Sequence, residues 1–326
     1  MKTFFAVLKN NYLRTVPRVV PMIFITAFTL LSTILGVHMT GVQQVKGHIA
    51  VITENATNAD AQYSRYLDVK TFSEKPPYSS LVEQKYDAYV TIDENGAYSI
   101  ETLKNDDYKK LLATLLESPN AEIPADKTAR GVGVNILGFM MMFLLMISLT
   151  NLFAFADDKE QGQLRRLAAA PAPFGAYLAA HCVYALSLLL PEYILLVILK
   201  MCGRDIGFTL PQYAGLMLLL GFLGISFGLL LNTLIKKPDN ANMLGNSVTV
   251  LSSILAGSFY SFSKDSPMLD KITTLLPQKD FMDFAIRLQN GEAASHLLPL
   301  IYVVAFALIL FTVSCVILQG MYVKKI

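Results

Sequence analysis

Charged residues are scarce in this sequence. Only 16% of its 326 residues are Asp, Glu, Lys or Arg, whereas 53% are hydrophobic, and the mean hydropathy is +0.45. A soluble protein of this length does not need such an apolar surplus, so the composition indicates long lipid-facing segments. The net charge of +2 gives no support to a nucleic-acid-binding protein.

Three further absences narrow the range of possible functions. The three cysteines, Cys182, Cys202 and Cys315, lie outside the long polar stretch, so we expect no disulfide framework and no metal site. The chain has no Gly-Lys dipeptide and therefore no P-loop that could hold the phosphates of ATP. No A-x-A cleavage site follows the first apolar run, which is too long for a signal peptide, so we expect it to remain as a span.

Six apolar runs come close to the roughly 20 residues that cross a bilayer. They cover residues 19–39, 134–155, 174–199, 214–235, 241–262 and 297–322. The fifth run is unusually polar, and such a helix persists in lipid only where its polar face packs against protein or lines a cavity. We therefore predict an α-helical polytopic membrane protein with six transmembrane helices.

The basic residues predict the orientation. They cluster before the first run, between the second and third, between the fourth and fifth, and at the C-terminus: Lys2, Lys9, Arg14 and Arg18; Lys159, Arg165 and Arg166; Lys236 and Lys237; Lys324 and Lys325. With six spans, all four clusters lie on one side, which the positive-inside rule makes the cytoplasm. We expect a multi-pass protein of the plasma membrane with both termini in the cytoplasm.

The long polar stretch, residues 40–130, is then a small extracytoplasmic α/β domain between the first and second spans. Alternating and β-branched patterns predict strands at residues 48–53, 68–72, 88–92 and 98–102. Helices are predicted at residues 79–85 and 106–117, the second with Asp106 and Asp107 in its first turn.

The first 18 residues have the pattern of an amphipathic helix. One face carries the apolar side chains Phe4, Phe5, Leu8, Tyr12 and Leu13, and Pro17 ends the helix. We predict a helix that lies in the membrane interface. The alternative is a frayed basic leader that only sets the topology.

The predicted cytoplasmic loop, residues 156–173, begins with charged residues, continues with a short helix-forming stretch and ends at Pro171 and Pro173. From the residues alone it is either a short helix that docks a soluble partner or an ordinary positively charged loop. Its pattern E-x-G-x-x-x-x-L-x-x-x-P, at Glu160, Gly162, Leu167 and Pro171, resembles the signature of permease subunits of type-2 ATP-binding-cassette (ABC) exporters. Gln163 departs from that family, which often has Thr there.

Two other stretches resemble the same family. Residues 256–259, 267–269 and 276–288 are similar to its external segment between the fifth and sixth spans. Residues 83–92 are similar to its recurring unit of a helix followed by a strand that ends in Ile. The resemblance extends over essentially the whole chain.

The resemblance implies a half-transporter. Two permease chains, identical or paralogous, would each rest on a separate ABC ATPase subunit that binds ATP and Mg, so this chain itself would hold no cofactor and bind no nucleic acid. Contact with the ATPase would fall to Glu160, Gly162, Leu164, Arg165 and Arg166. The external gate would include Gly257 and an amphipathic external segment at residues 263–295, with Pro267 and Pro277. The cargo expected from the family is an amphiphile moved outward, such as a drug, an antimicrobial, a lipid or a lipid-linked product. Sodium export remains open.

Polar residues inside the predicted spans give candidate pathway residues. Glu192 follows Pro191, and it is either a polar point on the substrate pathway, a proton-sensitive site or a carboxylate neutralised near the outer interface. Asn242 and Asn246 either line the pathway or hold helices together. We expect His181 to be a structural histidine with its hydrogen bonds satisfied.

Two other classes of protein compete with the transporter. A receptor or scaffold would sense an external ligand, and it would have either no ATPase partner or an ATPase whose turnover moves no cargo. An integral-membrane enzyme is a poor fit, because His181 and Glu192 are eleven residues apart, which is about 16 Å along a helix and too far for one site.

Overall fold

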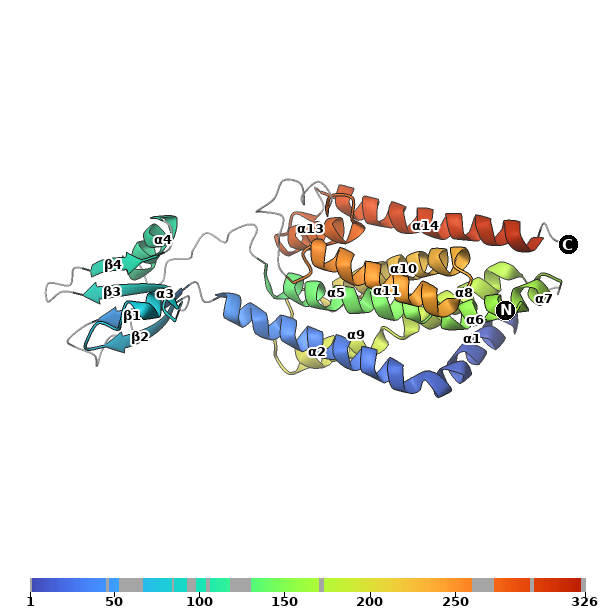
Figure 1. Cartoon of the computed structure of the whole chain (residues 1–326), viewed down its shortest axis with the longest axis horizontal. Coiled ribbons are helices and arrows are strands. Elements are labelled where there is room, and N and C mark those ends of the chain that lie inside the picture. Colours follow the sequence, from blue (N-terminus) through green and yellow to red (C-terminus); the bar gives the residue numbers. More distant parts are fainter. Residues whose placement is uncertain are drawn as a thin grey trace. The chain divides into compact units, whose positions relative to one another are not determined.

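The computed structural model describes residues 2–44, 47–52, 67–83, 85–92, 98–103, 106–117, 130–169, 173–259, 273–293 and 296–323. The chain forms two compact units (Figure 1). The helical unit comprises Met1–His38 and Arg130–Ile326, and the sheet unit comprises Met39–Ala129. The predicted α/β domain at residues 40–130 has nearly the bounds of the sheet unit.

The helical unit begins with α1 (Lys2–Thr15), the 3-10 turn η1 (Val16–Arg18) and α2 (Val19–Gln44). It continues with α5 (Val132–Thr150), α6 (Phe153–Glu160), α7 (Gln163–Ala169), α8 (Phe174–Ser187), α9 (Leu190–Met201), α10 (Leu210–Leu234), α11 (Pro238–Leu255), α13 (Pro277–Gln289) and α14 (Leu298–Val323). In the described residues, five helical stretches are long and apolar enough to cross a membrane: Lys2–His38, Val132–Glu160, Phe174–Met201, Leu210–Leu234 and Leu298–Gly320. They correspond to five of the six predicted spans.

The fifth predicted run, residues 241–262, forms a helix that is less apolar than the others. The helix is α11, 18 residues long, and residues 260–262 of the run lie outside the described part of the chain. Its polar side chains Thr249, Ser252 and Ser253 are buried, whereas Met243 and Leu251 are exposed. This inward polar face packs against protein, as the sequence required, and a sixth crossing of the membrane stays a prediction.

The core of the helical unit lies around α5. Most side chains of this helix are buried, and its neighbours include α10, α11 and α13. Helix α10 approaches it through a G-x-x-x-G pair, Gly224 and Gly228, because a side chain at either glycine would meet the α5 backbone. Small residues at this spacing let membrane helices pack closely.

The predicted helix at residues 1–18 is α1, and its end agrees with the position of Pro17. Helix α1 stops at Thr15, and η1 turns the chain into α2. Helix α1 packs on α8, with Asn11 buried and Phe5 and Leu13 exposed. Exposed apolar side chains on this helix fit the predicted place in the membrane interface.

The sheet unit holds a four-stranded mixed sheet in the order β2-β1-β3-β4. The strands are β1 (Gly47–Ile52), β2 (Leu67–Phe72), β3 (Ala88–Ile92) and β4 (Tyr98–Thr102), and the helices are α3 (Ser79–Val82) and α4 (Asp106–Glu117). Strand β1 pairs in parallel with β2 and β3, and β3 pairs antiparallel with β4.

Alternate residues of the central strands face two small cores. Ile49 and Val90 pack with Leu112 and Leu115 of α4, whereas Ala50 and Tyr89 pack with Leu81 of α3. The two helices thus cover opposite faces of the sheet, which follows from the period of two in strand side chains.

Candidate functional site

The joint between α6 and α7, residues 157–166, is a tight turn built on Gly162. This residue has φ = 70°, in the left-handed region that glycine adopts without strain. Its amide donates to the Lys159 carbonyl over 3.2 Å, and its own carbonyl accepts from the Arg165 amide over 3.2 Å. The turn therefore ends one helix and starts the next within a few residues.

The five residues predicted to contact an ATPase lie together at this joint. Glu160, Arg165 and Arg166 are exposed. Leu164 is buried in a cluster with Phe155 and other apolar side chains. The joint thus has charged side chains at its surface, and the buried side chain of Leu164 packs it against the apolar core.

The acidic pair at the start of the joint, Asp157 and Asp158, points inward to α1 and η1. Arg14 approaches Asp158 at 2.7 Å and Asp157 at 3.5 Å, and Arg18 approaches Asp157 at 3.0 Å. The Arg18 guanidinium also lies 4.5 Å from the centre of the Phe153 ring. These contacts hold the α6–α7 joint to the N-terminal helix.

A buried polar group continues this contact into α8. Asn11 donates from Nδ2 to Nδ1 of His181 over 3.1 Å, and both side chains are fully buried. Because Nδ1 accepts, the proton of the neutral ring is on Nε2, which lies 4.0 Å from Asp158. Tyr177 donates to the same carboxylate over 2.7 Å. The predicted satisfaction of His181 is met only in part, because Nδ1 has a hydrogen-bond partner and the buried Nε2 has none.

The joint is also attached to the end of α10. The Lys159 ammonium binds the carbonyls of Asn232, Thr233 and Ile235, the last two over 2.8 and 3.0 Å. These are carbonyls that the end of a helix leaves unpaired, and a cation is favoured there. One short segment thus contacts α1, α8 and α10.

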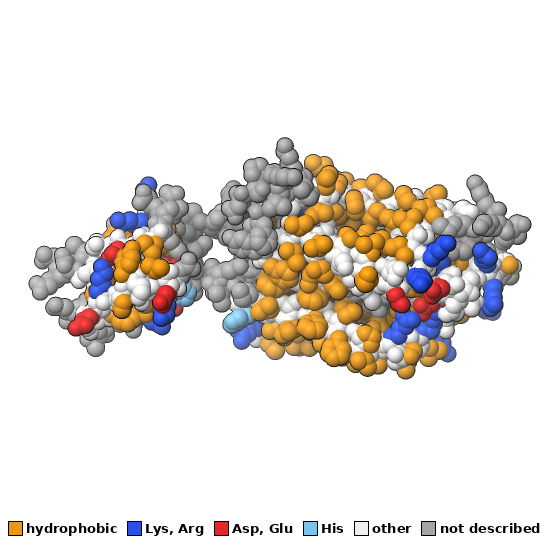
Figure 2. All heavy atoms as spheres, viewed as in Figure 1, with side chains coloured by type: hydrophobic (Ala, Val, Ile, Leu, Met, Phe, Trp, Pro, Cys, Tyr) orange, Lys and Arg blue, Asp and Glu red, His pale blue; other side chains and the backbone are white. Residues whose placement is uncertain are grey.

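A hollow of about 660 Å³ lies beside the joint. Its lining comes from α1, the joint, α7 and α8: Val7, Asn10, Arg14, Asp158, Gln161, Gln163, Leu164, Arg166, Leu167 and Tyr177. Figure 2 shows Lys, Arg, Asp and Glu gathered at this end of the helical unit, whereas hydrophobic side chains cover most of its length. Helix α14 also contacts α7 here. The charged side chains at this end and the volume of the hollow therefore suit the binding of a soluble partner.

Glu192, the first of the predicted pathway residues, lies in the first turn of α9. The third predicted span is interrupted there, because α8 ends at Ser187 and α9 starts at Leu190 with Pro191 in its first turn. Glu192 is 2% exposed, and its Oε1 accepts a hydrogen bond from Thr33 of α2. Its other oxygen is buried without a hydrogen-bond partner.

The predicted pathway residues Asn242 and Asn246 lie on α11. Asn246 pairs with Thr150 of α5 over 3.4 Å, and Asn242 is half-buried. In the part of the chain that the structure describes, no hydrogen bond joins either asparagine to Glu192. The structure uses Asn246 to hold two helices together, which was the alternative left open from the sequence.

Two of the predicted gate residues lie at the opposite end of the helical unit, and Pro267 lies outside the described residues. Gly257 follows α11 with φ = 84°, and Pro277 starts α13. Arg130 donates to the carbonyls of Gly257 and Ser258 and so holds the end of α11. Burial lowers the pKa of the Arg130 guanidinium, and Asp283 opposes that shift.

Gln278 links α13 to α11 through a hydrogen bond of 2.8 Å to Ser252. This bond joins the start of α13 to the C-terminal half of α11, and the gate itself stays a prediction.

Sequence reasoning missed the residues that fix the joint to α1. Asn11 and His181 are 170 positions apart, so nothing local predicts their contact. A signal was present for the ion pairs, because Arg14 and Arg18 have the spacing of one helical face and Asp157 and Asp158 follow a span.

The family described as ABC-2 family transporter protein matches residues 19–316, which is most of the chain. No curated protein matches the chain significantly.

Proposed function

Since the chain belongs to the ABC-2 family of transporter proteins, we propose that it is the transmembrane permease subunit of an ABC exporter. It moves an amphiphilic substrate, such as a drug, an antimicrobial, a lipid or a lipid-linked product, outward. The energy comes from ATP hydrolysed with Mg by a separate ATPase subunit. The observation that carries the proposal is the α6–α7 joint, whose exposed charges are attached to three helices of the helical unit.

The joint is suited to pass on movement. An ATPase that binds Glu160, Arg165 and Arg166 pushes on a turn that Gly162 keeps short. The ion pairs of Arg14 and the contacts of Lys159 carry the displacement to α1 and α10. A helical unit with two packing arrangements then opens its pathway first to one side and then to the other.

A second permease chain, identical or paralogous, completes the pathway, with one ATPase under each permease. Helix α11 supports the presence of a second permease, because its outward face carries exposed apolar side chains at helical spacing: Met243, Leu244, Val248 and Leu251. Its inward face is polar and already satisfied in part by α5 and α13. In a short helix with this arrangement, the exposed stripe is the surface for the partner permease.

The orientation follows from the charges. The joint, α1 and the Lys236–Lys237 pair face the cytoplasm of a cell whose plasma membrane holds the protein, and both termini lie on that side. The sheet unit is then extracytoplasmic, and the end that holds Arg130, Gly257 and Pro277 is the external gate.

Site-specific crosslinking tests the proposal. A photo-crosslinking amino acid in place of Arg165 is expected to form an adduct with a P-loop ATPase in native membranes, identified by mass spectrometry. The matched control replaces Lys70, which is exposed on β2 of the sheet unit and should give no such adduct. Failure of position 165 to capture an ATPase would contradict the proposal and favour a non-transporting receptor.

A further inference from the structure

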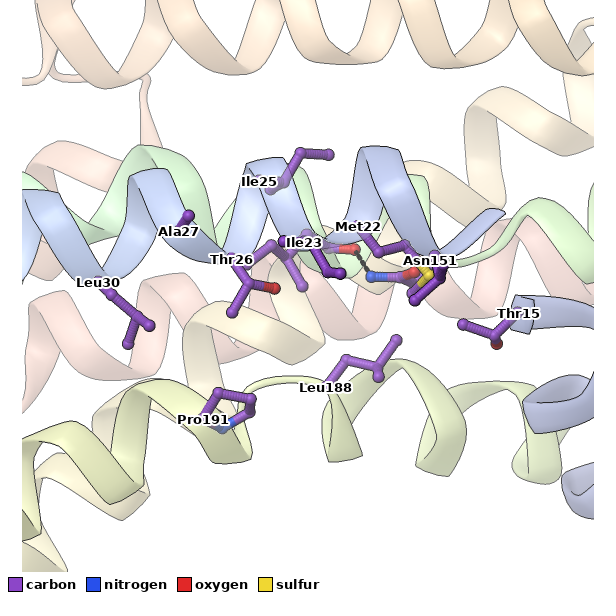
Figure 3. A pocket seen from close by; sticks show the side chains of 12 residues that line it. Thr15, Met22, Ile23, Ile25, Thr26, Ala27, Leu30, Asn151, Leu188 and Pro191 are labelled. Atoms are coloured by element: carbon purple, nitrogen blue, oxygen red, sulfur yellow. Dashed lines mark hydrogen bonds between the residues drawn. The ribbon is translucent and has the colours of Figure 1, made fainter. Parts of the chain in front are cut away.

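A cleft of about 400 Å³ lies between α2 and the junction of α8 with α9 (Figure 3). Thr26 and Leu30 of α2 face Leu188 and Pro191 of the junction across it. Helix α5 contributes to its lining through the buried Ile147. The break in the third span thus leaves room between three helices of the helical unit.

The lining of this cleft suits a hydrocarbon. Among the described residues that line it, none is charged. The amide of Asn151 is already used, because Nδ2 donates to the Ile147 carbonyl over 2.7 Å. The Thr15 hydroxyl likewise donates to the Asn11 carbonyl over 2.9 Å. A charged or strongly polar ligand would lose its hydration here and gain few partners.

The cleft opens to the outer surface of the helical unit. Val19 and Ile23 line it and are 44% and 59% exposed, and Pro191 is exposed as well. These residues belong to stretches that are long and apolar enough to cross a membrane. The surroundings of such side chains in a bilayer are lipid chains. Lipid chains are therefore the apolar molecules in direct contact with the mouth of the cleft.

The length of the cleft matches the depth of one lipid leaflet. Val19 and Leu30 line it eleven residues apart on α2, which is about 16 Å along the helix axis. The hydrocarbon core of a bilayer is about 30 Å thick, so the chains of one leaflet reach a depth of about 15 Å. Val19 follows Arg18, which pairs with Asp157 at the charged end of the unit. Leu30 lies midway along the apolar run at residues 19–39.

We propose that this cleft binds a membrane lipid from the leaflet on the side of the α6–α7 joint. One acyl chain lies between α2 and the α8–α9 junction, and the headgroup stays at the interface beside Thr15. The chain supplies van der Waals contacts that the walls of an empty cleft lack, and it thereby holds α2 against the broken third span. Because the contacts are with the chain, the headgroup is not selected. The inference needs a helical unit that crosses a membrane, and it is independent of the ATPase.

Photolabelling of the full-length protein in nanodiscs tests the proposal. The two probes are phosphatidylcholines that carry a diazirine either near the carboxyl end or at the methyl end of one acyl chain. We expect the methyl-end probe to label residues around Leu30 and Pro191, and the carboxyl-end probe to label residues around Thr15 and Val19, as located by mass spectrometry. Both should exceed the labelling of the exposed face of α14, which bulk lipid also reaches.

Thr26→Phe places a ring in the cleft and should lower the labelling at both ends to the level of α14. Thr26→Val keeps the shape of the side chain and should retain the labelling. The matched control is Thr312→Phe, the same change at an exposed position of α14, which should leave the labelling of the cleft unchanged.

Two results would overturn the proposal. One is labelling around α2 and the α8–α9 junction that does not exceed that of α14 in the native chain, which is decisive even if Thr26→Phe fails to fold. The other is undiminished labelling in Thr26→Phe with a normal gel-filtration profile. Because the assay contains no ATPase, either result leaves the ATPase adduct at position 165 as a separate test of the transporter function.

Discussion

At the scale of single residues, opposite charges connect the N-terminal helix to the α6–α7 joint. Arg14 contacts both Asp157 and Asp158, and Arg18 contacts Asp157. The side chains of Arg14 and Asp158 are only 24% and 16% exposed, so solvent screens this pair less than a surface ion pair. The ion pair between Arg14 and Asp158 therefore stabilises the fold. The exposed side chains of Glu160, Arg165 and Arg166 remain accessible to a partner.

Arg14→Ala should loosen α1 from the joint. Loss of a hydrogen bond to a charged group costs about 1.5–3 kcal/mol, and we expect a fall of that order in the free energy of unfolding. Thermal unfolding in one detergent measures it, with Arg204→Ala in an exposed loop as the control. The charge swap Arg14→Asp with Asp158→Arg should recover part of the loss. Equal stability of Arg14→Ala and the control would contradict this role.

Local residues were predictable where local geometry decides. Pro17 was expected to end a helix, and α1 stops at Thr15. The left-handed turn at Gly162 is likewise a local property, because glycine adopts that conformation without strain. The partner of His181 could not be predicted, because Asn11 reaches it only once α1 has folded back on α8. The free oxygen of Glu192 likewise depends on how α2 packs against α9.

At the scale of elements, close contact between α5 and α10 defines the centre of the helical unit. A Cβ atom at Gly224 would lie 2.8 Å from the Leu145 carbonyl oxygen and 2.9 Å from Cβ of Ser148. The same helix carries Gly215, where a Cβ atom would meet nothing within 4 Å. One helix therefore offers both a test position and its control.

Gly224→Ala should force α10 away from α5. We expect a destabilisation of about 1–3 kcal/mol, the usual cost of overpacking a core. Gly215→Ala should be neutral or stabilising, because alanine favours a helix by up to about 1 kcal/mol over glycine. Thermal unfolding of the two variants side by side is the measurement. Equal thermal stability of the two variants would show that the close approach of α10 to α5 does not limit stability.

The elements themselves were largely predictable. Strands β3 and β4 have the predicted bounds, and α4 does too, because strand and helix patterns there are strong. Helix α3 is shorter than predicted and ends at Val82. The third span is a broken helix, because Pro191 has no backbone N–H to continue the hydrogen bonds of α8. The proline in the sequence suggested a break but did not give its position.

At the scale of the whole molecule, the two units have separate cores. The core of the sheet unit includes Ile49, Val51 and Val90, all fully buried. Its cluster contains no residue of the helical unit among the described side chains. A change in this core should therefore leave the helical unit folded.

Ile49→Ala should destabilise the sheet unit by about 2–5 kcal/mol. Limited proteolysis of the full chain in nanodiscs should then give new cuts within residues 39–129, while the helical fragment from residue 130 onward stays intact. Lys70→Ala, an exposed change on the neighbouring strand, is the control. Simultaneous loss of both units would show that they unfold as one.

The central claim is that a separate ATPase drives this permease through the α6–α7 joint. The most direct measurement is gentle purification of the tagged chain from its native membrane, with mass spectrometry of the proteins that accompany it, beside a Glu160→Arg variant. We predict a P-loop ATPase with the native chain and much less of it with the variant, at equal recovery of folded permease. Absence of any ATPase in several detergents, or equal amounts with both chains, would contradict the account.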